Sequence, residues 1–155
     1  MGSAFTITSS VGFIQAMLFS LDTGAQLDFD LQPSEFEWKY EVGWEESGVI
    51  YGSPAPIEYR KTSPLEMTIN ANFDAYYKSG MSGSIAQPLN MIYVFSQRVP
   101  GRNRSHILQY MQGATTFVGV LRRASVKVRR LNSSGGPLQA LGAEIMLEEI
   151  VWNGV

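Results

Sequence analysis

Apolar and polar residues alternate along two long segments in the first half of the chain. One face of the first segment, residues 35–44, carries Phe36, Trp38, Tyr40, Val42 and Trp44. The matching face of the second segment, residues 65–74, carries Leu65, Met67, Ile69, Ala71 and Phe73. A period of two residues is typical of half-buried β-strands and does not fit a helix. We therefore predict that the two segments pair as a long hairpin spanning residues 35–74.

The loop that would connect these strands, residues 47–56, is longer and more apolar than a hairpin needs. A two-residue turn of the Asn-Gly type is enough to reverse a hairpin. This loop and the residue after it instead supply five hydrophobic side chains: Val49, Ile50, Tyr51, Pro54 and Ile57. Because exposed apolar patches mark interaction surfaces, we expect these five residues to contact a partner molecule.

The rest of the chain predicts more strands, one helix and a terminal arm. Further strands are expected at residues 16–21, 26–31, 106–112, 115–121, 124–131 and 138–152. Residues 1–15, rich in serine, threonine and glycine, indicate an extended arm, and residues 78–84 indicate a loop. The helix is expected over residues 87–97, where Pro88 suits the first turn and the apolar residues share one side. We therefore expect a mainly β fold: one domain, residues 1–155, built as an antiparallel β-sandwich or open barrel with one flanking α-helix.

The composition narrows the classes of protein to consider. The chain contains no cysteine, which excludes disulfides and thiolate metal sites. Charged residues make up 17% of the chain, fewer than the typical quarter. A folded chain with few charges has much neutral surface, which suits burial between subunits. No apolar run approaches the roughly 20 residues that a bilayer span needs, so we expect no membrane contact.

The charges are segregated along the sequence, although the formal net charge is only −2. Eleven of the 14 acidic residues lie in the first half: Asp22, Asp28, Asp30, Glu35, Glu37, Glu41, Glu45, Glu46, Glu58, Glu66 and Asp74. Eight of the 12 basic residues lie in residues 98–130, which contain no acid: Arg98, Arg102, Arg104, Arg122, Arg123, Lys127, Arg129 and Arg130. Such a cluster can neutralise phosphates, but it lacks the interleaved exposed aromatic residues that stack on bases. We favour neutralisation between the two halves, within one fold or across a head-to-tail contact.

Candidate catalytic chemistry is sparse. His106 is the only histidine, so a multi-histidine metal site is excluded and a Ser-His-Asp arrangement would depend on it. The acids Glu35, Glu37 and Glu41 are paired carboxylates of the kind that glycoside cleavage uses, but their alternate spacing fits a solvated strand face or ion pairs between subunits better. No phosphate-binding glycine motif is present. We therefore expect no enzyme, no metal and no cofactor.

Several short motifs, in order, resemble the contractile injection system tube protein family. They are Phe29-Asp-Leu-Gln-Pro-Ser-Glu35, Glu41-Val-Gly-Trp44, Tyr59-Arg-Lys-Thr-Ser-Pro-Leu-Glu-Met67, Phe73-Asp74 and Pro137-Leu-Gln-Ala-Leu-Gly-Ala-Glu-Ile-Met-Leu-Glu-Glu149. The resemblance covers roughly residues 16–150. It implies a tail-tube fold, in which six copies close into a ring around a lumen and a long hairpin reaches a neighbouring copy. Many members continue into a peptidoglycan-binding LysM module, which we do not expect here because the sequence ends at Trp152-Asn-Gly-Val155.

The resemblance also implies partners and a location. We expect a homohexameric virion structural protein, a tube initiator or adaptor that joins the inner tube to the baseplate hub. DNA or an effector would pass through the lumen without specific binding. The protein would be made in the cytoplasm of a host bacterium and would end in the virion tail or injection machine. The charged residues expected at contacts between copies are Glu35, Glu37, Glu41, Arg122, Lys127 and Arg129.

Two other functions remain open from the sequence. One is the major repeating subunit of the same tube. The other, from a different class, is a ligand-binding β-barrel in which Trp38, Trp44, Tyr76 and Tyr77 line a pocket. Stacking into filaments would favour the first alternative, and a monomer with a closed apolar cavity would favour the second.

Overall fold

The computed structural model describes residues 5–7, 16–29, 31, 33, 35–46, 57–62 and 64–150. In chain order its strands are β1 (Phe5–Ile7), β2 (Met17–Ser20), β3 (Gln26–Asp28), β4 (Glu35–Lys39), β5 (Val42–Glu46), β6 (Ile57–Thr62), β7 (Glu66–Asp74), β8 (Leu108–Gln112), β9 (Thr115–Ser125), β10 (Arg130–Leu131) and β11 (Pro137–Glu149). The helices are α1 (Tyr76–Ser79), the 3₁₀-helix η1 (Gly80–Ser82) and α2 (Ala86–Ser96).

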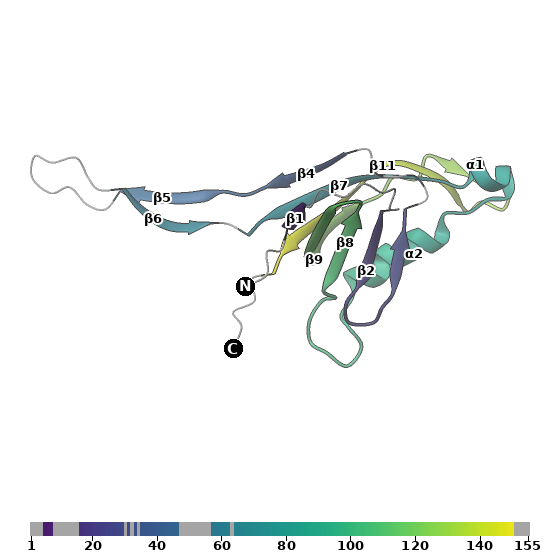
Figure 1. The fold of residues 1–155 in the computed structure, drawn as a ribbon. Helices are drawn as coiled ribbons and strands as arrows, with labels where there is room; N and C mark the ends of the chain where they lie inside the picture. Colours follow the sequence, from purple (N-terminus) through teal and green to yellow (C-terminus); the bar gives the residue numbers. More distant parts are fainter. Residues whose placement is uncertain are drawn as a thin grey trace, which may run out of the picture.

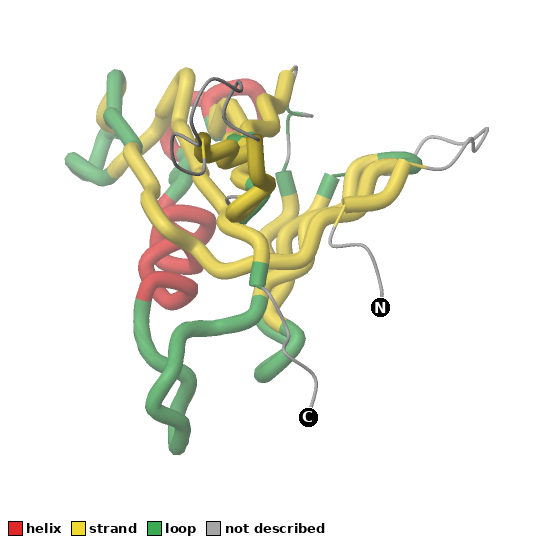
Figure 2. Tube along the Cα trace, turned by 90° about the vertical axis from the view of Figure 1, so that its left-hand side faces the viewer, coloured by secondary structure: helices red, strands yellow, loops and turns green. Residues whose placement is uncertain are grey.

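Most of the strands belong to one antiparallel sheet. Its order is β3-β2-β8-β9-β11-β7-β4, with β1 added beside β9 and β10 beside β11. The pair β5–β6 forms a separate two-stranded ribbon. Seen from the ribbon end, the sheet is bent rather than flat, and α2 lies along one side of it (Figure 2). The expected mainly β, antiparallel fold with one flanking helix and a long hairpin is confirmed.

The long hairpin is present but has two parts. Residues 35–44 were predicted to form one strand, whereas Tyr40 and Glu41 interrupt it between β4 and β5. As a result β4 pairs with β7 inside the sheet, and β5 pairs with β6 beyond it. Figure 1 shows β5 and β6 projecting away from the rest of the fold. The hairpin therefore anchors one end in the domain and extends the other end past it.

Two bulges bend the central strands. In β11, Leu141 and Gly142 together face the single residue Asn72 of β7, and Gly142 has a φ of 69° that favours glycine. The N–H of Gly142 donates to Asn72 Oδ1 at 2.9 Å. In β9, Arg122 is the extra residue opposite the Met146–Leu147 step of β11. Because a bulge bends its strand and increases its twist, these positions help to curve the sheet.

The core lies on one face of the bent sheet. The alternating residues of β7 behave as predicted, since Met67, Ile69, Ala71 and Phe73 are all buried. Phe29 packs between residues of two strands. Its ring centroid lies 6.0 Å from that of Phe73 on β7 and 6.0 Å from that of Tyr110 on β8. Helix α2, predicted one residue further along the chain, contributes Ile92 and Phe95. The core thus positions the helix against the sheet.

Three local predictions are wrong. Residues 124–131 do not form one strand, because β9 already occupies the edge of β11 up to the Ser125–Glu144 pair, which leaves only the 137–139 end for β10. Residues 126–129 therefore leave the sheet. The predicted loop at 78–84 contains α1 and η1, and Asp74 Oδ1 accepts the N–H of Tyr76 at 2.9 Å at their start. Strand β3 ends at Asp28 rather than at residue 31.

Candidate subunit interface

An aromatic stripe extends the core face of the sheet onto the hairpin. Phe36, opposite Ile69, still packs against the core. Beyond it Trp38, Tyr40 and Val42 are 48%, 52% and 42% exposed. The Trp38 and Tyr40 rings stack, with centroids 5.8 Å apart and an interplanar angle of 10°. We call Trp38, Tyr40 and Val42 the stripe; it is an apolar surface that is about half exposed.

The predicted contacts at the hairpin tip lie mostly outside the described residues. This applies to Val49, Ile50, Tyr51 and Pro54. Ile57 begins β6, where its backbone pairs with Glu46, and its side chain is outside the description. The stripe, by contrast, is fully described, and it lies at the base of the same hairpin.

The acidic residues predicted at the interface lie on the hairpin and are exposed. Glu35 and Glu37 alternate with the apolar residues of β4, and Glu41 follows in the interruption before β5. Glu35 Oε1 accepts a hydrogen bond from Asn70 Nδ2 at 2.9 Å. Glu37, opposite Thr68, forms no ion pair with a described residue. The face of β4 opposite the stripe thus carries Glu35 and Glu37, and also Lys39, which pairs with Glu66 of β7.

The basic residues predicted at the interface divide into two kinds. Arg122 Nε lies 2.8 Å from Glu148 Oε2, so this arginine already has a partner in its own chain. Its neighbour Arg123 makes a longer contact of 4.0 Å with Glu144. Lys127 and Arg129 are exposed, and neither forms an ion pair with a described residue. Among the predicted basic residues, these two are the ones available to an acid from outside.

An open groove of about 450 Å³ runs between α2 and the end of β9 with the segment that follows it. Its apolar lining comes from Leu89, Ile92, Tyr93, Leu121, Val126 and Val128. The residues Arg122 and Arg123 also line it. Sequence reasoning missed this groove because it placed Val126 and Val128 in a continuous strand. The signal was the alternation of valines with basic residues at 126–129, which also fits an exposed segment.

A second exposed apolar cluster lies at the end opposite the hairpin (Figure 1). It contains Tyr76, Tyr77 and Met81 from α1 and η1, with Leu131 from β10. The guanidinium carbon of Arg130 lies 5.6 Å from the centre of the Tyr76 ring, within the range of a cation–π contact. The four aromatic residues considered for a ligand pocket are thus not brought together: Trp38 is on the hairpin, Tyr76 and Tyr77 are at the far end, and the Trp44 side chain is outside the description.

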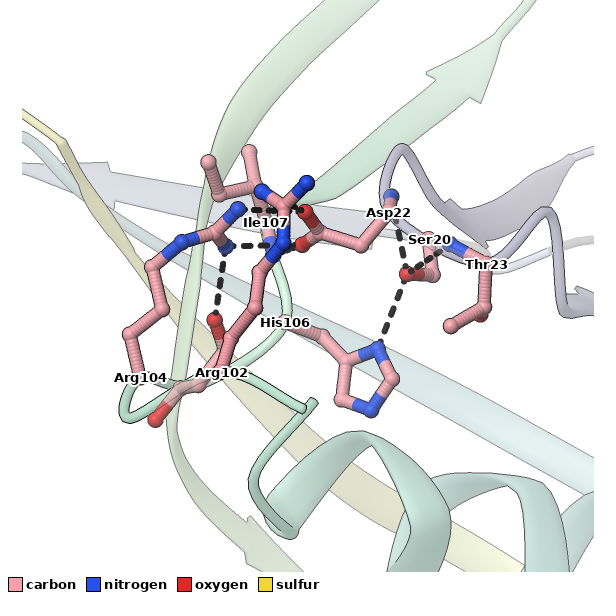
Figure 3. A network of polar contacts seen from close by, with 8 residues as sticks. Ser20, Asp22, Thr23, Arg102, Arg104, His106 and Ile107 are labelled. Carbon is pink, nitrogen blue, oxygen red and sulfur yellow. Dashed lines mark hydrogen bonds and ion pairs between the residues drawn. The ribbon is translucent and has the colours of Figure 1, made fainter. Parts of the chain in front are cut away.

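A partly buried polar network joins the β2–β3 turn to the segment before β8 (Figure 3). Asp22 accepts from Arg104 at 2.5 Å and 2.8 Å and from the N–H of Ile107 at 2.9 Å, while Arg102 lies 3.4 Å away. The hydrogen bonds from Arg104 and then from Ile107 hold the pKa of the Asp22 carboxyl well below its ordinary value. This network confirms, for Asp22, that an acid of the first half is neutralised by the basic run within one fold.

His106 belongs to the same network and is buried. Its Nδ1 lies 2.9 Å from the Oγ of Ser20. Since Ser20 Oγ also accepts the N–H groups of Asp22 and Thr23 at 3.2 Å and 3.3 Å, its own proton is free to point at His106 Nδ1. Ser20 and His106 are 1% and 2% exposed. The arrangement ties the turn to the neighbouring segment and offers no open face to a substrate.

Signs of other kinds of site are few in the described part of the chain. It contains no group of three or more histidine, aspartate or glutamate residues arranged to hold a metal ion. It also contains no helix of the length and apolarity that a membrane span requires. Comparison of the sequence with models of protein families and with curated proteins finds no match.

Proposed function

We propose that this protein is a structural component of a phage tail or a phage-like contractile injection machine. Six copies would close into a ring that joins the inner tube to the baseplate hub. The observation that carries the proposal is the stripe: Trp38, Tyr40 and Val42 form a half-exposed apolar surface on a hairpin that extends beyond the sheet. Such a surface has a cost in water unless another molecule covers it.

The open ends of the sheet also support assembly. Strands β3 and β4 are the two ends of the strand order, and neither has a second partner among the described residues. An unpaired strand edge presents N–H and C=O groups to solvent and templates pairing with another chain. A ring of identical copies pairs or covers such edges without leaving any copy different from the rest. Obligate interfaces of this kind often bury more than about 2,000 Å².

The mechanism of such a protein is geometric. Each copy would contribute the same wall segment to a central channel, and the hairpin would fix the angle between neighbours. DNA or an effector would pass through the channel without being recognised by sequence or shape. The motif order in residues 29–74 and 137–149 supports placing the ring at the tube and baseplate junction, beside tube and hub proteins.

The oligomeric state of the purified protein tests this proposal directly. Native mass spectrometry is expected to give a species of six times the 17.2 kDa chain mass. Electron micrographs of the same sample are expected to show rings with a central hole. A protein that stays monomeric at high micromolar concentration, with no rings in the images, would contradict the proposal.

A second candidate function is the major repeating subunit of the tube. The exposed cluster of Tyr76, Tyr77, Met81 and Leu131 favours it, because an apolar surface at the end opposite the hairpin suits stacking of one ring on the next. Filaments of indefinite length in the micrographs would support this candidate. Isolated rings would support the adaptor.

A further inference from the structure

We propose that the groove between α2 and residues 121–128 of one copy receives the stripe of a neighbouring copy. This inference rests on the proposed ring and identifies the receiving site, which neither the sequence nor the resemblance specifies. The stripe consists of Trp38, Tyr40 and Val42, and the groove has a volume of about 450 Å³. Pockets of roughly 300–1,000 Å³ accept ligands with several rings, so the groove has room for aromatic side chains.

The two surfaces match in chemistry. One wall of the groove is helix α2, with Leu89, Ile92 and the 66% exposed Tyr93. The other wall is apolar at Val126 and Val128, and Val128 is 38% exposed. Burying the stripe in this groove would remove apolar surface of both partners from water, at roughly 25 cal/mol per Å² buried.

The two surfaces also match in length. Three side chains at every second position of an extended chain span about 13 Å, at about 3.3 Å per residue. The part of α2 that lines the groove runs from Leu89 to Ser96. At 1.5 Å per residue it rises about 10 Å. The stripe can therefore lie along the helix with all three of its side chains in or beside the groove.

The charges select the orientation. The face of β4 that carries Glu35 and Glu37 is opposite the stripe. The wall of the groove opposite α2 carries Arg122 and Arg123 beside Val126 and Val128. Lys127 and Arg129 alternate with these valines along the same segment and do not line the groove itself. A ribbon placed with its stripe against α2 turns its acidic face toward this basic wall. Glu37, Lys127 and Arg129 form no ion pair with a described residue of their own chain, so they remain available for a contact at the edge of the groove.

Only a second copy can make this contact. None of the described hairpin residues lines the groove of its own chain. In the proposed ring the stripe of each copy meets the groove of the next, so the contact is head-to-tail and continues from copy to copy until the ring closes. Reciprocal exchange within a two-fold dimer would instead stop the cross-linked ladder at two chains. The inference thus gives the ring a specific head-to-tail contact.

Site-specific cross-linking tests the contact, and the natural absence of cysteine removes any background. The test variant carries Tyr40→Cys and Val128→Cys in one chain, at positions that are 52% and 38% exposed. A short bifunctional maleimide is expected to join the thiol at position 40 of one chain to the thiol at position 128 of the next and to give a ladder up to the hexamer on a denaturing gel. The matched control carries Tyr77→Cys, at a 77% exposed position, with Val128→Cys. It is expected to give at least fivefold less of every cross-linked species.

The outcomes separate the two proposals. Hexamers in native mass spectra and rings in micrographs, without cross-linking between positions 40 and 128, would overturn the groove contact. The ring proposal would stand. Absence of both rings and ladder would overturn both. A cross-link confined to one chain, identified by peptide mass, would also overturn the inference. A monomeric sample would overturn it too, if the thiol introduced at position 128 reacts as fast as a free thiol. The groove would then not be covered by a second copy.

Discussion

The indole ring of Trp38 lies nearly parallel to the ring of Tyr40, with an interplanar angle of 10° and a centroid distance of 5.8 Å. Stacked aromatic pairs are favourable at this separation. The pair is nevertheless about half exposed, at 48% and 52%. Two rings that support each other lose less conformational freedom when a partner covers them than two independent side chains would. The pair is therefore already ordered for the contact that we propose.

Removing the indole should weaken assembly without harming the fold. We expect Trp38→Ala to cost about 2 kcal/mol of association free energy at each contact, as for a central aromatic residue of an interface. This corresponds to roughly 30-fold weaker association. The measurement is the mass distribution of the protein by mass photometry as a function of concentration. The thermal unfolding of the monomer should change little because the side chain is half exposed.

Tyr77→Ala is the matched control for this variant. Tyr77 is 77% exposed, but it lies in α1 at the opposite end of the molecule from the hairpin. Its removal should leave ring formation within about twofold of the wild type. If Trp38→Ala and the wild type dissociate with the same midpoint concentration, the stripe does not contribute to assembly.

Reversing the basic charges beside the groove should also weaken assembly. We expect Lys127→Glu with Arg129→Glu to cost about 1–2 kcal/mol, because two attractive pairs become repulsive at a partly exposed site. The effect should be larger at low salt, where screening is weak. Sedimentation velocity at two salt concentrations measures it. Adding Glu37→Lys to the double variant should restore part of the association.

The control for charge alone is Arg98→Glu, compared with Lys127→Glu. Arg98 is exposed on the loop after α2, and its substitution by glutamate changes the net charge as much as Lys127→Glu does. It should leave assembly unchanged. If the double variant still forms rings but the passage of DNA or an effector is impaired, the basic residues line the channel and do not join neighbouring copies.

The sequence predicts those parts of the fold that depend on local alternation. Strand β7 and helix α2 were placed within one residue because their apolar residues recur at the periods of a strand and a helix. The end of β9 was misplaced because Val126 and Val128 alternate like a strand. What decides their conformation is the long-range competition for the edge of β11, which no local pattern encodes.

The candidate interface could be predicted only in part for the same reason. Alternation identifies Trp38 and Tyr40 as residues of one face, but it does not say whether that face is covered. In the structure Phe36 still packs against the core, whereas Trp38 near the end of β4 and Tyr40 just after it are about half exposed. The groove requires α2 to lie beside residues 121–128, and the ion pair of Asp22 with Arg104 joins residues 82 positions apart. Both are consequences of tertiary packing.

Gly119 of β9 has no room for a side chain. A Cβ built on Gly119 would lie 2.3 Å from the carbonyl oxygen of Glu148 and 2.9 Å from Cε1 of Phe117. The carbonyl cannot retreat without breaking the pairing of β9 with β11. We expect Gly119→Ala to cost about 2–3 kcal/mol of unfolding free energy, or roughly 4–12 °C in Tm. Thermal denaturation monitored by circular dichroism measures this change.

Gly113→Ala separates steric overlap from backbone strain. Gly113 has a φ of 56°, but a Cβ there meets nothing within 4 Å. Its substitution should cost only about 1–2 kcal/mol, the penalty for a left-handed residue. If Gly113→Ala lowers the Tm more than Gly119→Ala, close packing at Gly119 is not the stronger constraint.

The low pKa of Asp22 makes the fold sensitive to acid. In the unfolded chain its carboxyl binds a proton near the ordinary value of 3.8, whereas in the folded chain it stays ionised at lower pH. Unfolding therefore takes up a proton below about pH 4. The contribution of Asp22 to stability is complete above about pH 5 and declines as the pH falls further. Urea denaturation at pH 7 and pH 3, in the Trp38→Ala background to limit association, measures it.

Removing the Asp22 charge should lower the free energy of unfolding at neutral pH and make it depend less on pH. We expect Asp22→Asn to lose on the order of 1–3 kcal/mol at pH 7, because Arg104 and the N–H of Ile107 lose a charged acceptor. Its stability should then fall less than that of the parent between pH 7 and pH 3. Asp28→Asn removes the same charge at an exposed position of β3 and should follow the parent. Parallel profiles for Asp22→Asn and the parent would mean that other carboxyl groups control the acid sensitivity.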